Sequence, residues 1–534
     1  MRKLAFHPLL FAAWPVLSFL AHNVGEVPAR EAVRSLFVSV AVALLIFGLL
    51  SLALRNTGKA ALICSLALLF FFTYGHLYLI MKTWRIDGFF IGRHRFLLPL
   101  LLLLLVALSW WVARKLERVP EATSLFNLVG LALVALPIYA IVAYQLAPRT
   151  PASVQSNSAS GEASFAHQTG ALPDIYYIIV DGYGREDVLR ELYGFDNSDF
   201  IQFLRAQGFF VADNSRTNYA QTLLSLASSM NMQYLDDVTR RLGSGTTDRG
   251  VLIDMVFHSK ARSLLAREGY KFVAFETGYG GTSIVDADLY LAPHQTVRQP
   301  FLTSTLNEFE GAFLETTAVR ALLDEQILSE NAFFKNAFDP EYQRKRDRIL
   351  FTLSKLEDIP KMQGQYFVFA HVIAPHPPFV FGKDGEKVAP TGAYSLEDGD
   401  TFGGSQEAYI LGYRDQATFL NKQLEQTLSR IIARSDPAPI IILQGDHGPG
   451  AHLVWEAPDR SPMHERMTIL NAYYFPGEGS KLLYPSITPV NSFRALFDGY
   501  FGAGYSLLPD ESYFSTISRP YDFVRVTDRV LAGK

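Results

Sequence analysis

The chain has 534 residues, of which 49% are hydrophobic and only 19% are charged. Soluble domains carry about 25% charged residues, so the composition excludes a single soluble globule. The 48 basic residues are balanced by 52 acidic ones, which excludes a nucleic-acid binder held by bulk positive charge. The one cysteine, Cys64, excludes an intrachain disulfide and a zinc site made of several cysteines.

Apolar stretches dominate residues 1–146 and predict a transmembrane domain of about five helices. Three of the stretches have the roughly 20 residues needed to cross a hydrocarbon core of about 30 Å. The first is shorter and contains Trp14-Pro15; it could be a signal-peptide core, but no clear cleavage pattern follows, so we expect a retained helix. The stretches are Leu9–Leu20, Ser35–Leu54, Ala60–Met81, Phe96–Val112 and Leu125–Leu146.

The basic residues between these stretches do not set the orientation. With the N-terminus inside, the inner side carries seven Lys or Arg residues and the outer side carries six. A difference of one residue is too small for the positive-inside rule to indicate which side is cytoplasmic. An odd number of spans nevertheless places the two termini on opposite faces of the membrane.

Residues 147–173 are rich in Ser, Ala, Pro and Gly, a composition typical of a flexible linker. Residues 174–534 are enough to bury a substantial core. Short apolar runs that end in polar residues alternate there with helical patterns, which predicts an α/β domain with a mostly parallel sheet. The expected strands are Ile175–Val180, Tyr270–Phe275, Tyr366–Ala370 and Ile440–Leu443, and the expected helices are Leu223–Met232, Ser259–Glu268, Pro340–Leu356 and Gln406–Ala433.

Ligands bind at the carboxyl ends of the strands in such sheets, and polar residues follow all four of these strands. Gly445-Asp446-His447-Gly448 comes after the last strand and pairs a carboxylate with an imidazole, a donor set that suits Zn²⁺ or Mn²⁺. The alternative is an aspartate that caps the next turn beside a surface histidine. Asp181 ends the first strand and could share a metal with this pair, or form an ordinary Asp-Gly turn.

Thr222 lies where a helix is expected to begin. It could be a simple N-cap. A helix N-terminus also favours phosphate, and a hydroxyl next to a metal there would be an activated nucleophile.

Four histidines complete the candidate residues. His376 stands between prolines, which restrict its backbone, and it could bind a phosphoryl oxygen, protonate a leaving group or be structural. His371, His452 and His464 are further candidates of the same kind.

Together these residues resemble the alkaline phosphatase superfamily in its sulfatase-like branch. The likeness is to membrane-anchored lipoteichoic acid synthases and phosphoethanolamine transferases, which place five transmembrane helices before an extracytoplasmic catalytic domain. It rests on Asp446-His447-Gly448 and His376-Pro377, with Asp181 and Thr222 placed by context. It implies an inner-membrane, multi-pass enzyme whose threonine takes a phospho-alcohol group from a lipid donor and passes it to an envelope glycan or lipid.

By this resemblance Thr222 is the nucleophile and a metal ligand, alongside Asp181, Asp446 and His447. His376 holds the substrate phosphate, and His371 and His464 assist in substrate binding. The expected cofactor is one divalent Zn²⁺ or Mn²⁺ ion, or two if further histidines contribute. Lipoteichoic acid synthases have Glu at the position of Asp181, and phosphoethanolamine transferases usually have disulfides, so the match is incomplete.

Two other functions stay open at this point. A phosphodiesterase or phosphatase would use the same residues with water as the acceptor. A catalytically silent envelope scaffold would bind no stoichiometric metal. A sulfatase of the formylglycine type is disfavoured, because Cys64 lies in an apolar stretch and no serine version of the C/S-x-P-x-R motif follows.

Overall fold

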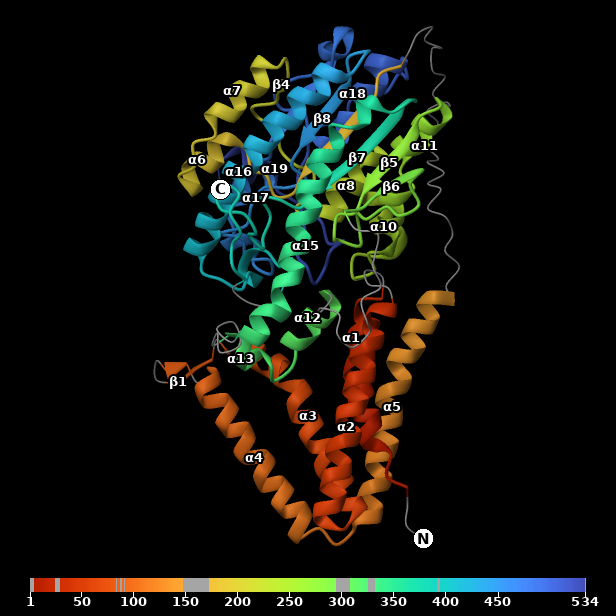
Figure 1. Ribbon diagram of the computed structural model, residues 1–534, viewed down its shortest axis with the longest axis vertical. Coiled ribbons are helices and arrows are strands. Elements are labelled where there is room, and N and C mark those ends of the chain that lie inside the picture. The colour runs from red at the N-terminus through yellow and green to blue at the C-terminus, as the bar shows by residue number, and fades with distance from the viewer. Residues whose placement is uncertain are drawn as a thin grey trace. The chain divides into compact units, whose positions relative to one another are not determined.

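The computed structural model describes residues 4–24, 29–82, 84–86, 89–90, 92–146, 172–293, 308–324, 332–390 and 394–533 (Figure 1). Its chain divides into two compact units. Unit 1 contains the N-terminal helices together with described residues 308–324, 332–341, 390 and 394–395. Unit 2 contains described residues 172–293, 342–389 and 396–533. Nearly all of the expected linker, residues 147–171, lies outside the described residues, and the predicted domain boundaries stay a prediction.

Unit 1 forms one helix at each of the five apolar stretches. The helices are α1 (His7–His22), α2 (Val33–Leu54), α3 (Thr57–Met81), α4 (His94–Arg114) and α5 (Val119–Leu146). Four of them, α2 to α5, are long and apolar enough to cross a membrane. With 16 residues α1 is shorter, and its crossing stays a prediction. The remaining described elements are the turn η1 (Ala29–Ala32), the hairpin of β1 (Arg85–Ile86) and β2 (Phe89–Phe90), and the helices α12 (Glu308–Glu315) and α13 (Arg320–Asp324).

Large apolar side chains cover the outside of these helices. Leu45 on α2, Leu103 on α4 and Leu136 on α5 are each more than 60% exposed. Apolar surface of this extent is typical of a membrane or protein interface, and together with the length of α2 to α5 it agrees with a membrane-spanning unit.

Unit 2 is built on a seven-stranded sheet in the order β4-β9-β8-β3-β7-β5-β6. Only β9 runs against the others, so the predicted α/β class with a mostly parallel sheet is confirmed. The strands are β3 (Ile175–Val180), β4 (Phe210–Val211), β5 (Lys271–Phe275), β6 (Leu289–Leu291), β7 (Tyr366–Val372), β8 (Ile440–Gln444) and β9 (Asn471–Tyr474).

The central strand β3 has both faces covered. Its residues Ile175, Tyr177 and Ile179 belong to a core formed with helices α8, α10, α11 and α18. Tyr176, Ile178 and Val180 point to the opposite face and are also fully buried. This burial explains why β3 reads as a continuous apolar run rather than an alternating one.

The described part of unit 2 also contains helices and a second, two-stranded sheet. The helices are α6 (Glu186–Tyr193), α7 (Ser198–Ala206), α8 (Thr222–Asn231), α9 (Asp236–Leu242), α10 (Gly250–Phe257), α11 (Lys260–Arg267), α15 (Ala332–Leu356, which begins in unit 1), α16 (Gln406–Arg434), α17 (Met463–Met467), α18 (Pro489–Phe501) and α19 (Thr527–Leu531). The two-stranded sheet pairs β10 (Tyr513–Phe514) with β11 (Val524–Arg525), and η2 to η5 are short turns at Ile359–Lys361, Gly399–Thr401, Pro458–Arg460 and Gly477–Leu482.

Candidate active site

The candidate residues meet at the carboxyl ends of three neighbouring strands. Asp446 and His447 follow β8, Asp181 follows β3, and His371 lies near the end of β7. The backbone joins these ends: Asp181 N donates to Val372 O at 3.0 Å, and His376 N donates to Asp181 O at 3.1 Å. The expected strand 366–370 extends to Val372, which makes His371 part of β7 and fixes its ring beside β3.

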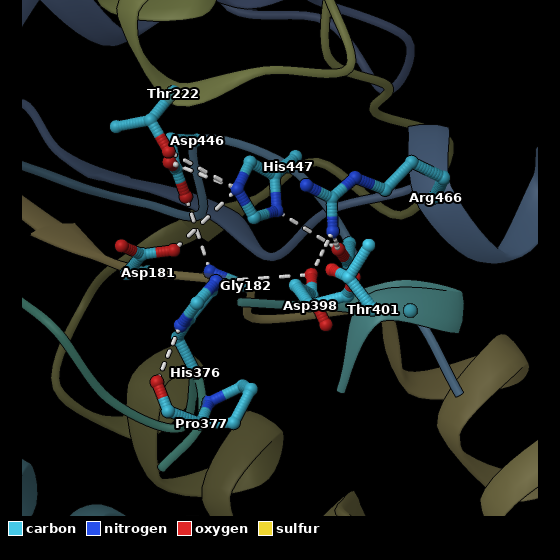
Figure 2. Close-up of polar contacts among 12 residues, drawn as sticks. Asp181, Gly182, Thr222, His376, Pro377, Asp398, Thr401, Asp446, His447 and Arg466 are labelled. Carbon is cyan, nitrogen blue, oxygen red and sulfur yellow. Dashed lines mark hydrogen bonds and ion pairs between the residues drawn. The ribbon is translucent and has the colours of Figure 1, made fainter. Parts of the chain in front are cut away.

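His447 is oriented so that one ring nitrogen faces the centre of the cluster. Its Nδ1–H donates to the carbonyl oxygen of Gly448 at 2.9 Å. A carbonyl can only accept, so the proton occupies Nδ1 and the lone pair lies on Nε2. That atom lies 3.4 Å from Asp446 Oδ2, 3.5 Å from Asp181 Oδ1 and 3.2 Å from Thr222 Oγ1 (Figure 2).

Several ligand-type atoms in this cluster are buried without a hydrogen-bond partner among the described residues. They are Asp181 Oδ1, Asp446 Oδ2 and His371 Nε2. Burying polar atoms without partners is costly, and a bound ion would satisfy them. Two triads have their ligand atoms within 4.8 Å of one another: Asp181 with His376 and His447, and Asp181 with His371 and Asp446. The donor set therefore fits a divalent metal.

The electrostatics favour the protonation states that bind a metal. Burial alone would raise the pKa of Asp181, but the neighbouring His376, His371 and His447 bring it well below its usual range. Burial is the main reason that the pKa of His447 is lowered. The carboxylate is thus charged and the imidazole neutral at pH 7, which are the forms that coordinate metal ions.

Thr222 is the first residue of α8, and the capping position before it belongs to Gln221. The structure therefore does not use Thr222 as the N-cap. Its hydroxyl points to His447 Nε2 instead, as Figure 2 shows. The partial positive charge at the start of α8 faces the same region and would stabilise an anionic group there.

His376 is held by contacts that the sequence did not reveal. Its Nδ1–H donates to Pro377 O at 2.7 Å, and its Nε2 lies 3.7 Å from Asp398 Oδ2. Asp398 is buried and also accepts hydrogen bonds from Arg466 and from Tyr409. Burial would raise the pKa of Asp398, but Arg466 and the histidines lower it to about 2. Asp398 and Arg466 lack any local motif that could have marked them.

The other two histidines are not joined to the cluster by any contact described in the structure. His464 lies on α17, and neither of its ring nitrogens has a hydrogen-bond partner among the described residues. His452 Nδ1 pairs with the buried Glu465 at 3.0 Å. The role of His464 in substrate binding stays a prediction.

Comparison with known proteins gives only distant likenesses. No protein-family model and no curated protein matches the sequence. The C-terminal periplasmic domain of EcEptC from Escherichia coli, in complex with Zn, matches 68% of this chain and 95% of its own, with 10% identity and a TM-score of 0.41.

Two further solved structures are similar to a comparable degree. The integral membrane protein lipooligosaccharide phosphoethanolamine transferase A from Neisseria meningitidis matches 92% of this chain and 95% of its own, with 12% identity and a TM-score of 0.38. A putative sulfatase from Bacteroides thetaiotaomicron matches 66% of this chain and 74% of its own, with 13% identity and a TM-score of 0.36. Identities and TM-scores are low throughout, so the function has to be argued from the site itself.

Proposed function

We propose that this chain is a membrane-anchored, metal-dependent phosphotransferase that uses Thr222 as its nucleophile. The observation that carries the proposal is the 3.2 Å approach of Thr222 Oγ1 to His447 Nε2. It lies inside a buried cluster in which several ligand-type atoms have no hydrogen-bond partner among the described residues. Such an arrangement places a hydroxyl, an ion site and a helix N-terminus around one point. These are the parts that phosphoryl transfer needs.

Asp181, Asp446, His447 and Thr222 would hold the ion, with His371 close enough to contribute. We propose Zn²⁺ or Mn²⁺, because the donors are imidazole nitrogen and carboxylate oxygen. When bound, the ion acts as a Lewis acid that lowers the pKa of a hydroxyl and offsets negative charge on a phosphoryl group. It would also compensate the two buried carboxylates.

The positions of the side chains support a reaction in two steps. Thr222 Oγ gives up its proton to solvent and attacks the phosphorus of a phosphodiester lipid, so that the new Oγ–P bond forms and the bond from phosphorus to the lipid alcohol breaks. His376 donates a proton to the departing alcohol, and the adjacent Asp398 carboxylate stabilises its protonated ring. In the second step an acceptor hydroxyl on an envelope glycan or lipid passes its proton to His376 and attacks phosphorus, the Oγ–P bond breaks, and Thr222 Oγ takes up a proton from solvent.

The apolar helices of unit 1 support a lipid as the donor, because most phospholipids that a membrane-anchored enzyme meets contain a phosphodiester. We place the catalytic unit on the extracytoplasmic side of the inner membrane, in line with the sequence resemblance. The same residues would act as a hydrolase if water replaced the acceptor in the second step.

The test uses the purified full-length chain with a phospholipid labelled in its headgroup phosphate. Thr222→Ala is expected to lower release of the lipid alcohol by at least about 10³-fold, as loss of a nucleophile does in other enzymes. Thr418→Ala, at a half-buried threonine on α16 whose hydroxyl donates to Arg414 O, is the matched control and is expected to retain full activity. Mass spectrometry without acceptor is expected to find the phosphorylated group on Thr222.

Adding candidate glycan or lipid acceptors distinguishes transfer of the group from its hydrolysis. Label that moves to the acceptor supports the transferase, and label that moves only to water supports the hydrolase. Unchanged turnover in Thr222→Ala would overturn the nucleophile. A purified protein without stoichiometric metal and without turnover would favour the scaffold.

A further inference from the structure

Unit 1 contains a cavity of about 650 Å³ that the proposed reaction does not explain. Its lining residues come from α2, α3, α4, α12 and the loop after α12, all within the same unit. Cavities that bind small molecules or cofactors have volumes of about 300–1,000 Å³ and mainly apolar walls with a few polar groups. The size of this cavity is therefore that of a ligand site rather than of a packing defect.

The polar lining residues gather at one end of the cavity. Arg34 and Ser35 stand at the start of α2, Tyr74 lies in the last turns of α3, and Glu310 comes from α12. The loop after α12 is fixed to α3, because Gly75 N donates to Thr316 O at 3.0 Å and Ala318 N donates to Phe71 O at 2.8 Å. This end is thus a built feature of the unit.

The opposite end is apolar. It is lined by Val42 and Ile46 on α2, Ala67 on α3 and Leu105 on α4. Arg34 and Ile46 are 12 positions apart, which is about 18 Å at a rise of about 1.5 Å per residue. Half of a hydrocarbon core of about 30 Å is about 15 Å, so the cavity has roughly the depth of one lipid leaflet.

Some of the side chains that line the cavity are themselves exposed. Val38 and Val42 on α2 are 43% and 44% exposed, and Leu102 on α4 is 51% exposed. The cavity therefore opens sideways between α2 and α4. In a membrane, that opening faces lipid chains.

The polar end of the cavity contains one positively and one negatively charged side chain, and both are buried. Arg34 Nε donates to Glu310 Oε1 at 2.6 Å, a second bond joins Nη2 to Oε2, and the two side chains are 13% and 4% exposed. Charged groups are costly to bury, and within a transmembrane unit they commonly mark a functional site. A guanidinium pairs well with phosphate and a carboxylate with ammonium, so the pair complements a headgroup that carries both charges.

We propose that this cavity binds a zwitterionic phospholipid, with one acyl chain along α2 and the headgroup at Arg34 and Glu310. The proposal concerns unit 1 alone and holds whether or not that lipid is the donor of the proposed reaction. The apolar length, the sideways opening and the charge pair at one end together match the shape of a lipid.

The test uses the full-length protein in detergent micelles with a phosphatidylcholine that carries a diazirine in one acyl chain. After irradiation, peptides containing the lining residues of α2, α3 and α4 are expected to hold most of the label, and unlabelled phosphatidylcholine is expected to compete. Label spread evenly over the exposed faces of α2, α4 and α5 would overturn the proposal, because it would report only the surrounding micelle.

Two matched variants test whether the labelling depends on the cavity. Ala67→Phe places a ring in the apolar end and is expected to reduce competable labelling by about tenfold, the loss that follows from expelling about two methylene groups. Ala41→Phe makes the same change at an exposed position of α2 that does not line the cavity, and is expected to label normally. Wild-type labelling in a folded Ala67→Phe protein would contradict the proposal. If that variant does not fold, the peptide map of the unaltered protein decides.

The headgroup is tested with phosphatidylglycerol that carries the same acyl probe. The unaltered protein is expected to prefer phosphatidylcholine, and the double variant Arg34→Gln/Glu310→Gln is expected to lose that preference while the acyl label stays on the same peptides. A preference of the unaltered protein for phosphatidylglycerol would overturn the headgroup assignment.

Discussion

Asp398 and Arg466 form a buried ion pair 68 positions apart in the sequence, and the Asp398 oxygen that accepts from Arg466 is also the one nearest to His376. Arg466 makes two further bonds, to Ala220 O and Gly448 O. The pair thus connects the loop before α8, which leads to Thr222, with the turn that carries His447. We infer that the ion pair fixes the positions of the two segments that lead to Thr222 and carry His447.

The first prediction concerns this ion pair. Asp398→Asn is expected to lower the free energy of unfolding by about 3–5 kcal/mol, because it leaves the charge of a buried arginine uncompensated. Activity is expected to fall as well, since His376 loses the carboxylate beside its Nε2. Denaturant unfolding and turnover of the same preparation measure both effects.

Asp187→Asn provides the control for that experiment. Asp187 forms an ion pair with Arg185, but its side chain is 57% exposed. Surface pairs of this kind contribute about 0–1 kcal/mol, so little change is expected. Equal effects of the two substitutions would contradict the assigned role of Asp398.

The second prediction concerns metal removal. Chelation is expected to lower the Tm of unit 2, because Asp181 and Asp446 are left as buried carboxylates with unpaired oxygens. A free metal concentration one hundred times the Kd stabilises a protein by about 2.7 kcal/mol. Zn²⁺ or Mn²⁺ added back is expected to restore the Tm. In Asp446→Asn the chelator response should be absent, and a full response there would place the ion elsewhere.

The third prediction concerns pH. The hydrogen bond to buried Glu465 raises the pKa of His452 above its ordinary value of 6.5. A raised pKa contributes stability that is fully present below about pH 6.5 and is lost as the pH rises through the folded-state pKa. The Tm difference between the unaltered protein and His452→Gln is therefore expected to be larger at about pH 6 than at about pH 9. A difference that grows with pH would show the sign to be wrong.

The fourth prediction concerns Gly448. A Cβ at this position would lie 2.1 Å from Glu465 O and 2.8 Å from Thr468 O, both of them backbone atoms that cannot simply turn away. Gly448→Ala is expected to cost about 1–3 kcal/mol of stability through this overpacking. Activity should also fall, because the Gly448 carbonyl orients His447.

Gly403→Ala is the control, since a Cβ there meets nothing within 4 Å. Thermal unfolding of both variants, with turnover measured on the same samples, tests the prediction. A Gly448→Ala protein with the stability and turnover of Gly403→Ala would refute it.

The site residues that follow strands were predicted from the sequence. An apolar run that stops at an acid or a histidine identified Asp181, His371 and Asp446-His447, and the parallel order of β8, β3 and β7 puts these positions at one edge. The strand β9 was not predicted, because Asn471–Tyr474 is only four residues long and carries a polar residue. Such a short segment becomes a strand through its pairing with β8 rather than through its own pattern.

The sequence by itself determined the membrane helices, the mostly parallel sheet and the residue types of the candidate site, because hydropathy, helix length and strand periodicity are local properties. Tertiary structure alone decided that Thr222 meets His447 across 225 positions and that Asp398 and Arg466 support His376. It also gave unit 1 its cavity and the Arg34–Glu310 pair. These contacts depend on how distant segments pack together, and no local pattern encodes that packing.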